Sequence, residues 1–211
     1  MPVITIAREF GAGGSRVAVM LAQRLEAEVI DRRLVAEVAG RLGFPAAAVA
    51  AQDEHAKSIV DRIVRSFASI GETYGTGWDV RYGEPLADPQ EAVRLLTEQV
   101  ICQTARRGNA IIIGRGGAFV LADWPAVLHV VLRSAEPVRM RAIMARFAFA
   151  EEEARGRLRQ IDADRAAYVR QNYGTDWRDP RHYDLVLDTG RLGYQRATDT
   201  ILAAVLPSAE A

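Results

Sequence analysis

The most informative stretch of the sequence is Val3-Ile-Thr-Ile-Ala-Arg-Glu-Phe-Gly-Ala-Gly-Gly-Ser15. Its pattern predicts a short β-branched strand, a glycine-rich turn and the first residues of a helix. Gly11, Gly13 and Gly14 lack the Cβ atoms that would keep a phosphate away from the backbone, and N–H groups at a helix start attract an anion. The stretch therefore predicts a phosphate-binding loop.

The loop matches only part of the phosphate-loop pattern G-x-x-x-x-G-K-S/T. Gly13 takes the place of the second glycine, and Ser15 takes that of the hydroxyl that binds Mg²⁺. Arg8 stands where the first glycine is expected, and Gly14 stands where the lysine is expected. Arg8 or Arg16 can supply the missing positive charge, and we favour Arg8 because it leaves the end of the predicted strand.

Two other interpretations of the turn remain open. A glycine-rich turn can pack a strand closely against a helix without binding a ligand. A dinucleotide-binding loop is the weaker of the two, because its G-x-G-x-x-G pattern needs a glycine where Arg16 stands.

The rest of the sequence alternates between apolar runs and helical periodicity, which is typical of an α/β fold. The runs are continuous, as expected for strands of a parallel sheet that is covered on both faces. They lie at residues 3–6, 27–30, 110–113, 128–132 and 185–187. Helical periodicity covers residues 15–25, 32–42, 91–106 and 136–147. We therefore predict one α/β domain over residues 1–211, with a five-stranded parallel sheet flanked by helices.

Two segments interrupt this alternation. Residues 44–89 contain an alanine-rich piece and a Gly/Pro/Asp-rich loop, and they predict an inserted subdomain. Residues 150–183 are rich in arginine and predict a mobile lid that contributes Arg159 and Arg165 to the site. The alternative for each lid arginine is a solvated helix face with ion pairs such as that of Glu151 with Arg155.

Charge and cysteine content exclude several classes of protein. Lys+Arg and Asp+Glu both number 27, so the chain lacks the basic character of most nucleic-acid-binding proteins. Lys57 is the only lysine, so phosphate recognition must depend on guanidinium groups. Cys102 is the only cysteine, which excludes a disulfide framework and a thiolate metal site. With neither a signal-peptide pattern nor a long apolar segment, we expect a cytoplasmic protein without a membrane partner.

Charged residues also follow the second and third predicted strands, where ligands of parallel sheets gather. Asp31 follows the second strand, and Arg115 lies between glycines after the third. An arginine flanked by glycines can bind a second phosphate, so these residues predict an acceptor site. A helix cap at Asp31 and a structural salt bridge at Arg115 are the alternatives.

Five pieces of the sequence together resemble the nucleoside monophosphate kinases, and most closely the cytidylate kinase-like family of P-loop phosphotransferases. These pieces are Ala7-Arg-Glu-Phe-Gly-Ala-Gly-Gly14, Asp31-Arg-Arg-Leu-Val35, Gly108-Asn-Ala-Ile-Ile-Ile-Gly-Arg-Gly116, Asp162-Ala-Asp-Arg-Ala-Ala-Tyr168 and Tyr183-Asp-Leu-Val-Leu-Asp-Thr-Gly-Arg-Leu-Gly193. The resemblance covers nearly the whole chain. It implies a P-loop NTPase fold in which residues 44–89 bind the acceptor.

The resemblance also implies an activity, namely ATP- and Mg²⁺-dependent phosphoryl transfer to a nucleoside monophosphate, with CMP or dCMP as the first acceptors to test. It implies that Asp31 and Arg115 bind the monophosphate, that Arg139 meets the donor phosphates, and that Arg165 belongs to the lid with Asp162. Arg8, Arg139, Arg159 and Arg165 are then the expected catalytic cations. The donor is expected to bind at Gly11, Ala12, Gly13, Gly14, Ser15 and Arg16, with Ser15 as the Mg²⁺ ligand.

The sequence departs from the family pattern at two positions, which keeps two other functions open. Gly14 replaces the lysine, and Gly116 replaces the aspartate of the Gly-Arg-Asp motif. A nucleotide-binding regulatory or sensor protein with little turnover is one alternative. A kinase for another small-molecule acceptor is the other, because the loop that contains Tyr74, Trp78 and Tyr82 is unusual.

Overall fold

The computed structural model describes residues 1–31 and 89–205. The chain divides into two compact units, one made of Met1–Val29 with Gly108–Ala211 and the other of Ile30–Arg107. The predicted helix at residues 32–42 and nearly all of the predicted insert at 44–89 lie outside the described residues. So do Tyr74, Trp78 and Tyr82, so the acceptor-binding role of this insert stays a prediction.

The described part of the second unit consists mainly of α4 (Pro89–Arg107), which corresponds to the helical periodicity at residues 91–106. Leu96, Val100 and Ile101 of this helix are buried. Leu96 and Val100 are four residues apart, which places them on one face of the helix. This spacing explains why the periodicity of the sequence predicted the helix.

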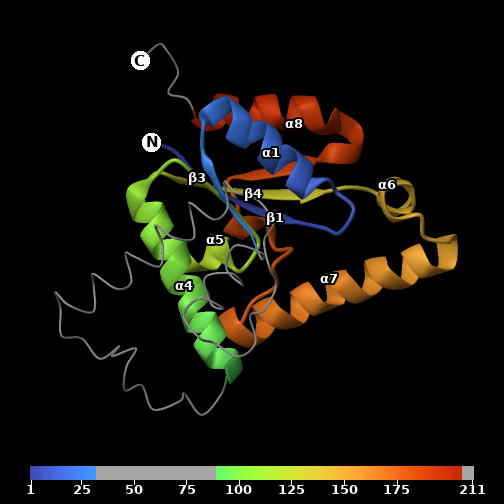
Figure 1. The fold of residues 1–211 in the computed structure, drawn as a ribbon, viewed down its shortest axis with the longest axis horizontal. Coiled ribbons are helices and arrows are strands. Elements are labelled where there is room, and N and C mark those ends of the chain that lie inside the picture. Colours follow the sequence, from blue (N-terminus) through green and yellow to red (C-terminus); the bar gives the residue numbers. More distant parts are fainter. Residues whose placement is uncertain (32–88, 206–211) are drawn as a thin grey trace. The chain divides into compact units, whose positions relative to one another are not determined.

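The first unit contains the sheet, whose strands lie in the order β2-β3-β1-β4-β5 (Figure 1). The strands are β1 (Val3–Arg8), β2 (Glu28–Ile30), β3 (Ala110–Ile113), β4 (Val127–Arg133) and β5 (Leu185–Asp188). The pairs of β1 with β3, of β1 with β4 and of β4 with β5 are all parallel. Because β1 is central, the loop that follows it lies in the middle of the carboxyl edge of the sheet.

Among its described residues, the same unit has six helical elements. They are α1 (Gly14–Leu25), α5 (Gly117–Val120), α6 (Glu136–Phe147), α7 (Glu151–Tyr173), the short 3₁₀ helix η1 (Pro180–His182) and α8 (Thr189–Val205). Gly193 interrupts α8 with non-helical dihedral angles. Among the described residues, no helix is both long enough and apolar enough to cross a membrane.

Alternate strand residues build two cores, one on each face of the sheet. Ile4, Ile6 and Val130 pack with residues of α1 and α8. Val131, which points to the opposite face, packs with residues of α5 and α7. Figure 1 shows α1 and α8 on one side of the sheet and α5 and α7 on the other. Both faces are therefore covered, as the continuous apolar runs predicted.

The strands are longer than their apolar runs at the carboxyl edge. Arg8 pairs with Leu132, and Arg133 pairs with Asp188, so backbone pairing continues beyond the last apolar residue of each run. The segment at residues 150–183 forms the long helix α7 and η1. Its predicted mobility stays a prediction.

Candidate phosphate-binding site

The loop after β1 leads into a helix that has no side-chain cap. Gly13 is the N-cap of α1, with φ 77° and ψ 16°. The N–H groups of Arg16 and Val17 donate to the Gly13 carbonyl at 2.9 and 3.0 Å. The first N–H groups of a helix have no intrahelical acceptor, so those of Gly14 and Ser15 are available to an anion. Ser15 is the second residue of α1 and therefore does not cap it.

Residues from distant parts of the chain hold this loop in place. The Thr189 hydroxyl donates to the Ala12 carbonyl at 2.8 Å. The N–H of Ser134 donates to the Glu9 carboxylate at 3.0 Å. Both partners follow strand ends, so the loop is fastened to the carboxyl edge of the sheet on the side of β4 and β5.

The glycines of the loop are needed for close packing within the protein. A Cβ atom at Gly11 would lie 2.9 Å from the carbonyl oxygen of Arg139, and one at Gly13 would collide with the ring of Tyr194. The space beside these missing Cβ atoms is therefore occupied by protein rather than left open for a phosphate. Gly11 and Gly13 thus allow close packing on this side of the loop, while the N–H groups at the helix start remain available to an anion.

The side chain of Arg8 lies over Gly14, the position at which the standard pattern has its lysine. A Cβ atom at Gly14 would lie only 2.6 Å from Cγ of Arg8, and one at Gly114 would collide with Nη1 of Arg8. The side chain of Arg8 thus runs over Gly14 toward the loop after β3. The Arg16 guanidinium instead lies 5.1 Å from the centre of the Tyr194 ring. This geometry favours Arg8 over Arg16 as the source of the missing charge.

Arg139 forms a buried ion pair beside the loop. Its Nη1 donates to Asp162 at 2.6 Å and to the Phe10 carbonyl at 3.2 Å, and its Nε lies 3.5 Å from Glu9. The side chains of Arg139 and Asp162 are only 8% and 5% exposed. In this structure Arg139 therefore holds α6, α7 and the loop together, and its predicted contact with donor phosphates stays a prediction.

Asp162 connects α7 to the loop. Its Oδ1 accepts a hydrogen bond from the Phe10 N–H at 2.8 Å, and Arg165 donates to the Arg8 carbonyl at 2.7 Å. Arg178 lies 3.8 Å from the other carboxylate oxygen of Asp162. Burial lowers the pKa of Arg165, and the Asp162 carboxylate opposes this shift. The site thus gathers several guanidinium groups around one buried carboxylate.

A second glycine-containing loop follows β3. Gly114, Arg115 and Gly116 all have left-handed backbone angles, with φ of 70°, 56° and 71°. A Cβ atom at Gly116 would collide with the ring of Tyr173, which stacks on Phe119 at 5.2 Å. The position at which the related motif has an aspartate therefore has no room for a side chain, because the tyrosine at the end of α7 fills it.

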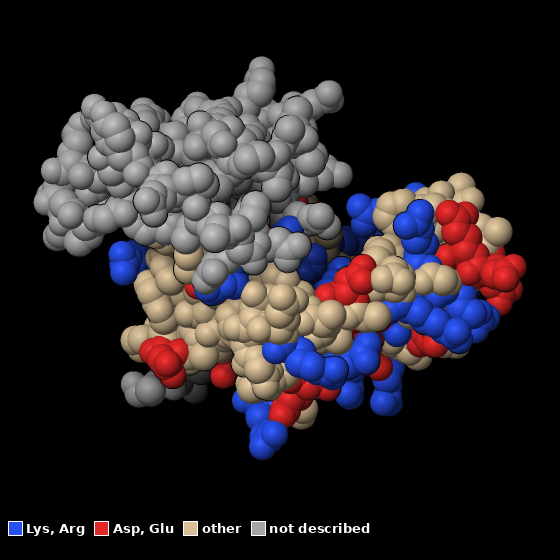
Figure 2. Space-filling view, turned by 90° about the horizontal axis from the view of Figure 1, so that it is seen from below, with Lys and Arg blue, Asp and Glu red and all other residues tan. Residues whose placement is uncertain are grey.

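One predicted site residue lies outside this arrangement, and another belongs to the second unit. Arg159 is exposed on α7. Acidic and basic side chains lie side by side at the right of Figure 2. Within α7, Arg155 pairs with Glu151 at 2.8 Å. This part of the predicted lid is a solvated face. Asp31 directly follows β2 but belongs to the second unit, so its role in acceptor binding stays a prediction.

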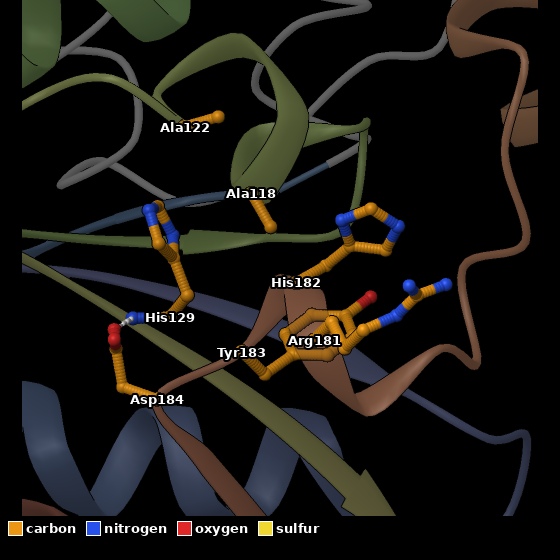
Figure 3. A pocket seen from close by; sticks show the side chains of 7 residues that line it. All are labelled: Ala118, Ala122, His129, Arg181, His182, Tyr183 and Asp184. Carbon is orange, nitrogen blue, oxygen red and sulfur yellow. Dashed lines mark hydrogen bonds between the residues drawn. The ribbon is translucent and has the colours of Figure 1, made fainter.

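A separate pocket of about 230 Å³ lies nearer the amino ends of β4 and β5 (Figure 3). His129 lines it, and its ring Nδ1 is hydrogen-bonded to the Thr5 hydroxyl at 2.8 Å. The backbone N–H of His129 donates to the Asp184 carboxylate at 2.7 Å. Burial lowers the pKa of His129. His129 is thus a packed residue of β4, with 8% of its surface exposed.

Sequence reasoning missed several residues that shape the site. Glu9 and Thr189 form hydrogen bonds that hold the loop in place. Each lies just after a predicted strand, and this position could have indicated that they lie near the site. Tyr173 and Tyr194 gave no signal, because their contacts with Gly116 and Gly13 join residues that are far apart in the chain.

Comparison with known proteins agrees with this architecture. A model described as the cytidylate kinase-like family matches residues 3–191. A cytidylate kinase of Methanopyrus kandleri is 29% identical over 142 residues, which cover 64% of this chain and 74% of that protein. A cytidylate kinase of Ignicoccus hospitalis is 28% identical over 121 residues, which cover 57% and 69%.

Two solved structures share the fold. An uncharacterized protein from Eubacterium ventriosum superimposes with a TM-score of 0.70 at 20% identity, over 97% of this chain and 98% of that one. Shikimate kinase from Bacteroides thetaiotaomicron gives 0.50 at 14% identity, with the same coverage. The predicted P-loop fold with a five-stranded parallel sheet is thereby confirmed.

Proposed function

The chain belongs to the cytidylate kinase-like family, and we propose that it transfers a phosphoryl group from ATP to a nucleoside monophosphate. CMP and dCMP are the first acceptors to test, because the curated relatives are named cytidylate kinases. Family membership and the P-loop fold together support a nucleotide kinase.

One observation carries the proposal. The N-terminus of α1 lies at the carboxyl end of the central strand, and its N-cap residue, Gly13, provides no side-chain cap. The helix dipole and the free N–H groups of Gly14 and Ser15 favour a phosphate at this place. The arginines around the loop add positive charge, which phosphoryl transfer requires at the donor phosphates.

The residues present also fit a magnesium nucleotide. Among residues 1–31 and 89–205, no cluster of three or more acidic, histidine or cysteine side chains could hold a metal ion. Magnesium bound with a nucleotide uses mostly phosphate oxygens and waters, so one protein ligand is sufficient. Ser15, in the first turn of α1, would supply this ligand with its hydroxyl oxygen. The ion would neutralise charge on the donor phosphates.

On the acceptor side, we assign the monophosphate to Arg115. This residue follows β3, and β3 lies next to β1, so the loop that carries it adjoins the donor loop. The contact of Arg8 with Gly114 shows how close the two loops are. Asp31, after β2, would contact the sugar or base of the acceptor.

A second candidate is a kinase for a different small acceptor. The ring of Tyr173 occupies the place beside Gly116 where the related motif has an aspartate. A carboxylate that could accept hydrogen bonds from a cytosine amino group is therefore replaced by a phenol. This observation makes acceptors without an amino-substituted base worth including in the test.

The test is ADP release from ATP and Mg²⁺ with a panel of nucleoside monophosphates, shikimate and a blank without acceptor. Release that depends on CMP or dCMP would support the proposal, and release with another acceptor would favour the second candidate. No release above the blank, from protein that circular dichroism shows to be folded, would contradict both. A nucleotide-binding sensor would then be the better interpretation if ATP still binds.

A further inference from the structure

We propose that Arg8 and Gly14 form a complementary pair in which Arg8 provides the cation of the phosphate loop from its first position. The lysine of the standard pattern would stand at position 14. The proposal rests on the proposed function, because it names the residue that stabilises the phosphates of that same site.

Gly14 differs from the other glycines of the loop in the reason for its presence. Gly11 and Gly13 have φ angles of 84° and 77°, which disfavour other residues whatever the surrounding space. Gly14 is the first residue of α1 and lies outside the left-handed region, so its backbone admits any residue. What excludes a side chain there is the stem of Arg8, with Cγ at 2.6 Å, Cβ at 3.0 Å and Cδ at 3.3 Å from an added Cβ.

The guanidinium of Arg8 ends between the two loops. Its Nη1 lies against Gly114, which directly precedes Arg115. Ile6 pairs with Ile113, so the ends of β1 and β3 lie side by side. A lysine extending from position 14 would start from α1, whereas Arg8 starts from β1 and points toward the acceptor loop.

This position suits a group that contacts both the donor phosphates at the start of α1 and the acceptor phosphate at Arg115. A guanidinium is planar, stays charged at neutral pH and can bind two oxyanions through separate N–H groups. Between the start of α1 and Arg115, it would neutralise the charge that spreads over the oxygens of the transferred group. Arg8 would thus act on the donor and the acceptor together.

The first experiment exchanges the two residues. The double substitution of Arg8→Gly with Gly14→Lys creates the standard pattern Gly-Glu-Phe-Gly-Ala-Gly-Lys-Ser. We expect Gly14→Lys alone to lower both the melting temperature and ADP release, because its stem collides with that of Arg8. In the Arg8→Gly background, the same change should restore release at least tenfold over either single variant. Equal effects of Gly14→Lys in both backgrounds would overturn the pairing, because residues in contact are expected to be non-additive.

The second experiment removes only the charge. Arg8→Met keeps the aliphatic stem over Gly14, and we expect it to lower ADP release about 10³-fold, as loss of a catalytic arginine does. Arg196→Met, an exposed arginine on α8, is the matched control and should leave release unchanged. If Arg8→Met releases ADP at a rate within threefold of the wild type, the proposal is overturned. This experiment remains decisive even if the double variant does not fold.

Binding separates this proposal from the proposed function. If the wild type releases no ADP with any acceptor, the kinase assignment fails, and calorimetric titration with ATP and Mg²⁺ still tests Arg8. We expect Arg8→Met to bind ATP at least tenfold more weakly than the wild type. Equal affinities would overturn the role of Arg8, whatever the enzyme assay shows.

Discussion

The loops that follow β1 and β3 share one local structure. Each ends in an N-cap glycine in the left-handed region, Gly13 with φ 77° and ψ 16° and Gly116 with φ 71° and ψ 15°. A tyrosine ring from another helix lies against each glycine, Tyr194 against the first and Tyr173 against the second. Neither helix has a side-chain cap.

The two loops differ in the helices that they begin. The loop after β1 leads into α1, which has 12 residues, whereas α5 has only 4. A long helix has a macrodipole and aligned N–H groups that stabilise an anion at its N-terminus, whereas a helix of one turn has only a small dipole. We therefore infer that the first loop recognises phosphate with the backbone N–H groups of α1 together with Arg8, whereas the second depends mainly on the side chain of Arg115. Each prediction below tests one part of this difference.

The largest effect is expected from Arg115→Met. If the second loop depends on this side chain, acceptor-dependent ADP release should fall about 10³-fold. The dissociation constant for ATP should stay within about threefold of the wild type, because the first loop is intact. Steady-state assays and calorimetry measure the two quantities, with Arg196→Met as the control. A variant that loses ATP affinity as strongly as turnover would show that the two loops do not recognise separate phosphates.

A loss of stability is expected from Arg139→Met. The first loop is fastened by a buried ion pair, that of Arg139 with Asp162 at 2.6 Å. Removal of Arg139 leaves the buried Asp162 carboxylate without its main counter-charge, which should lower the free energy of unfolding by about 3 kcal/mol. Urea titration measures this loss. Arg155→Met, which removes the exposed ion pair with Glu151, is the control. It should lower the free energy of unfolding by less than about 1 kcal/mol. Equal costs for the two variants would mean that the buried pair does not brace the loop.

A smaller loss of stability is expected from Gly116→Ala. Gly116 and Gly174 have nearly the same φ, 71° and 68°, but only Gly116 has a ring beside it. Gly174→Ala measures the cost of the backbone conformation alone, about 1 kcal/mol. Gly116→Ala should cost at least about 1 kcal/mol more, because Tyr173 must move or the loop must distort. If thermal unfolding gives the same cost for both, the ring does not constrain the second loop.

The smallest effect concerns acid stability and should arise outside both loops. Burial lowers the pKa of His129 below the ordinary histidine value of 6.5, and nearby Asp184 opposes this shift. The unfolded chain therefore takes up a proton first, and the unfolding free energy should fall as the pH drops below about 6.5 toward the lowered pKa. His129→Gln should lose less stability between about pH 7.5 and pH 5.5 than the wild type does. Arg181 and His182, which line the same pocket, are unchanged in both proteins. The same pH dependence in both would place the titration elsewhere.

The sequence predicted the fold better than the contacts of the site. The strand at residues 110–113 and the helix at 136–147 have the predicted bounds, because their apolar residues repeat with one clear period. Arg8 and Arg133 were left out of their strands, since strand pairing at the carboxyl edge does not require apolar side chains.

The site was harder to predict because its contacts cross the chain. The position of Arg8 in the loop pattern indicated its importance. That Tyr173 fills the space beside Gly116, or that Asp162 accepts a hydrogen bond from Phe10, depends on how α7 lies against the sheet. No local pattern in the sequence contains that information.

The hydrogen bond from Thr189 to Ala12 joins residues 177 positions apart, and that from Phe10 to Asp162 joins residues 152 apart. During synthesis, the N-terminal loop leaves the ribosome long before either partner has been made. Closure of such long loops costs chain entropy and slows folding. The phosphate loop therefore reaches its final geometry only after β5 and the start of α8 have been synthesised, so nucleotide binding at this loop would report that the chain has been made at least as far as Thr189.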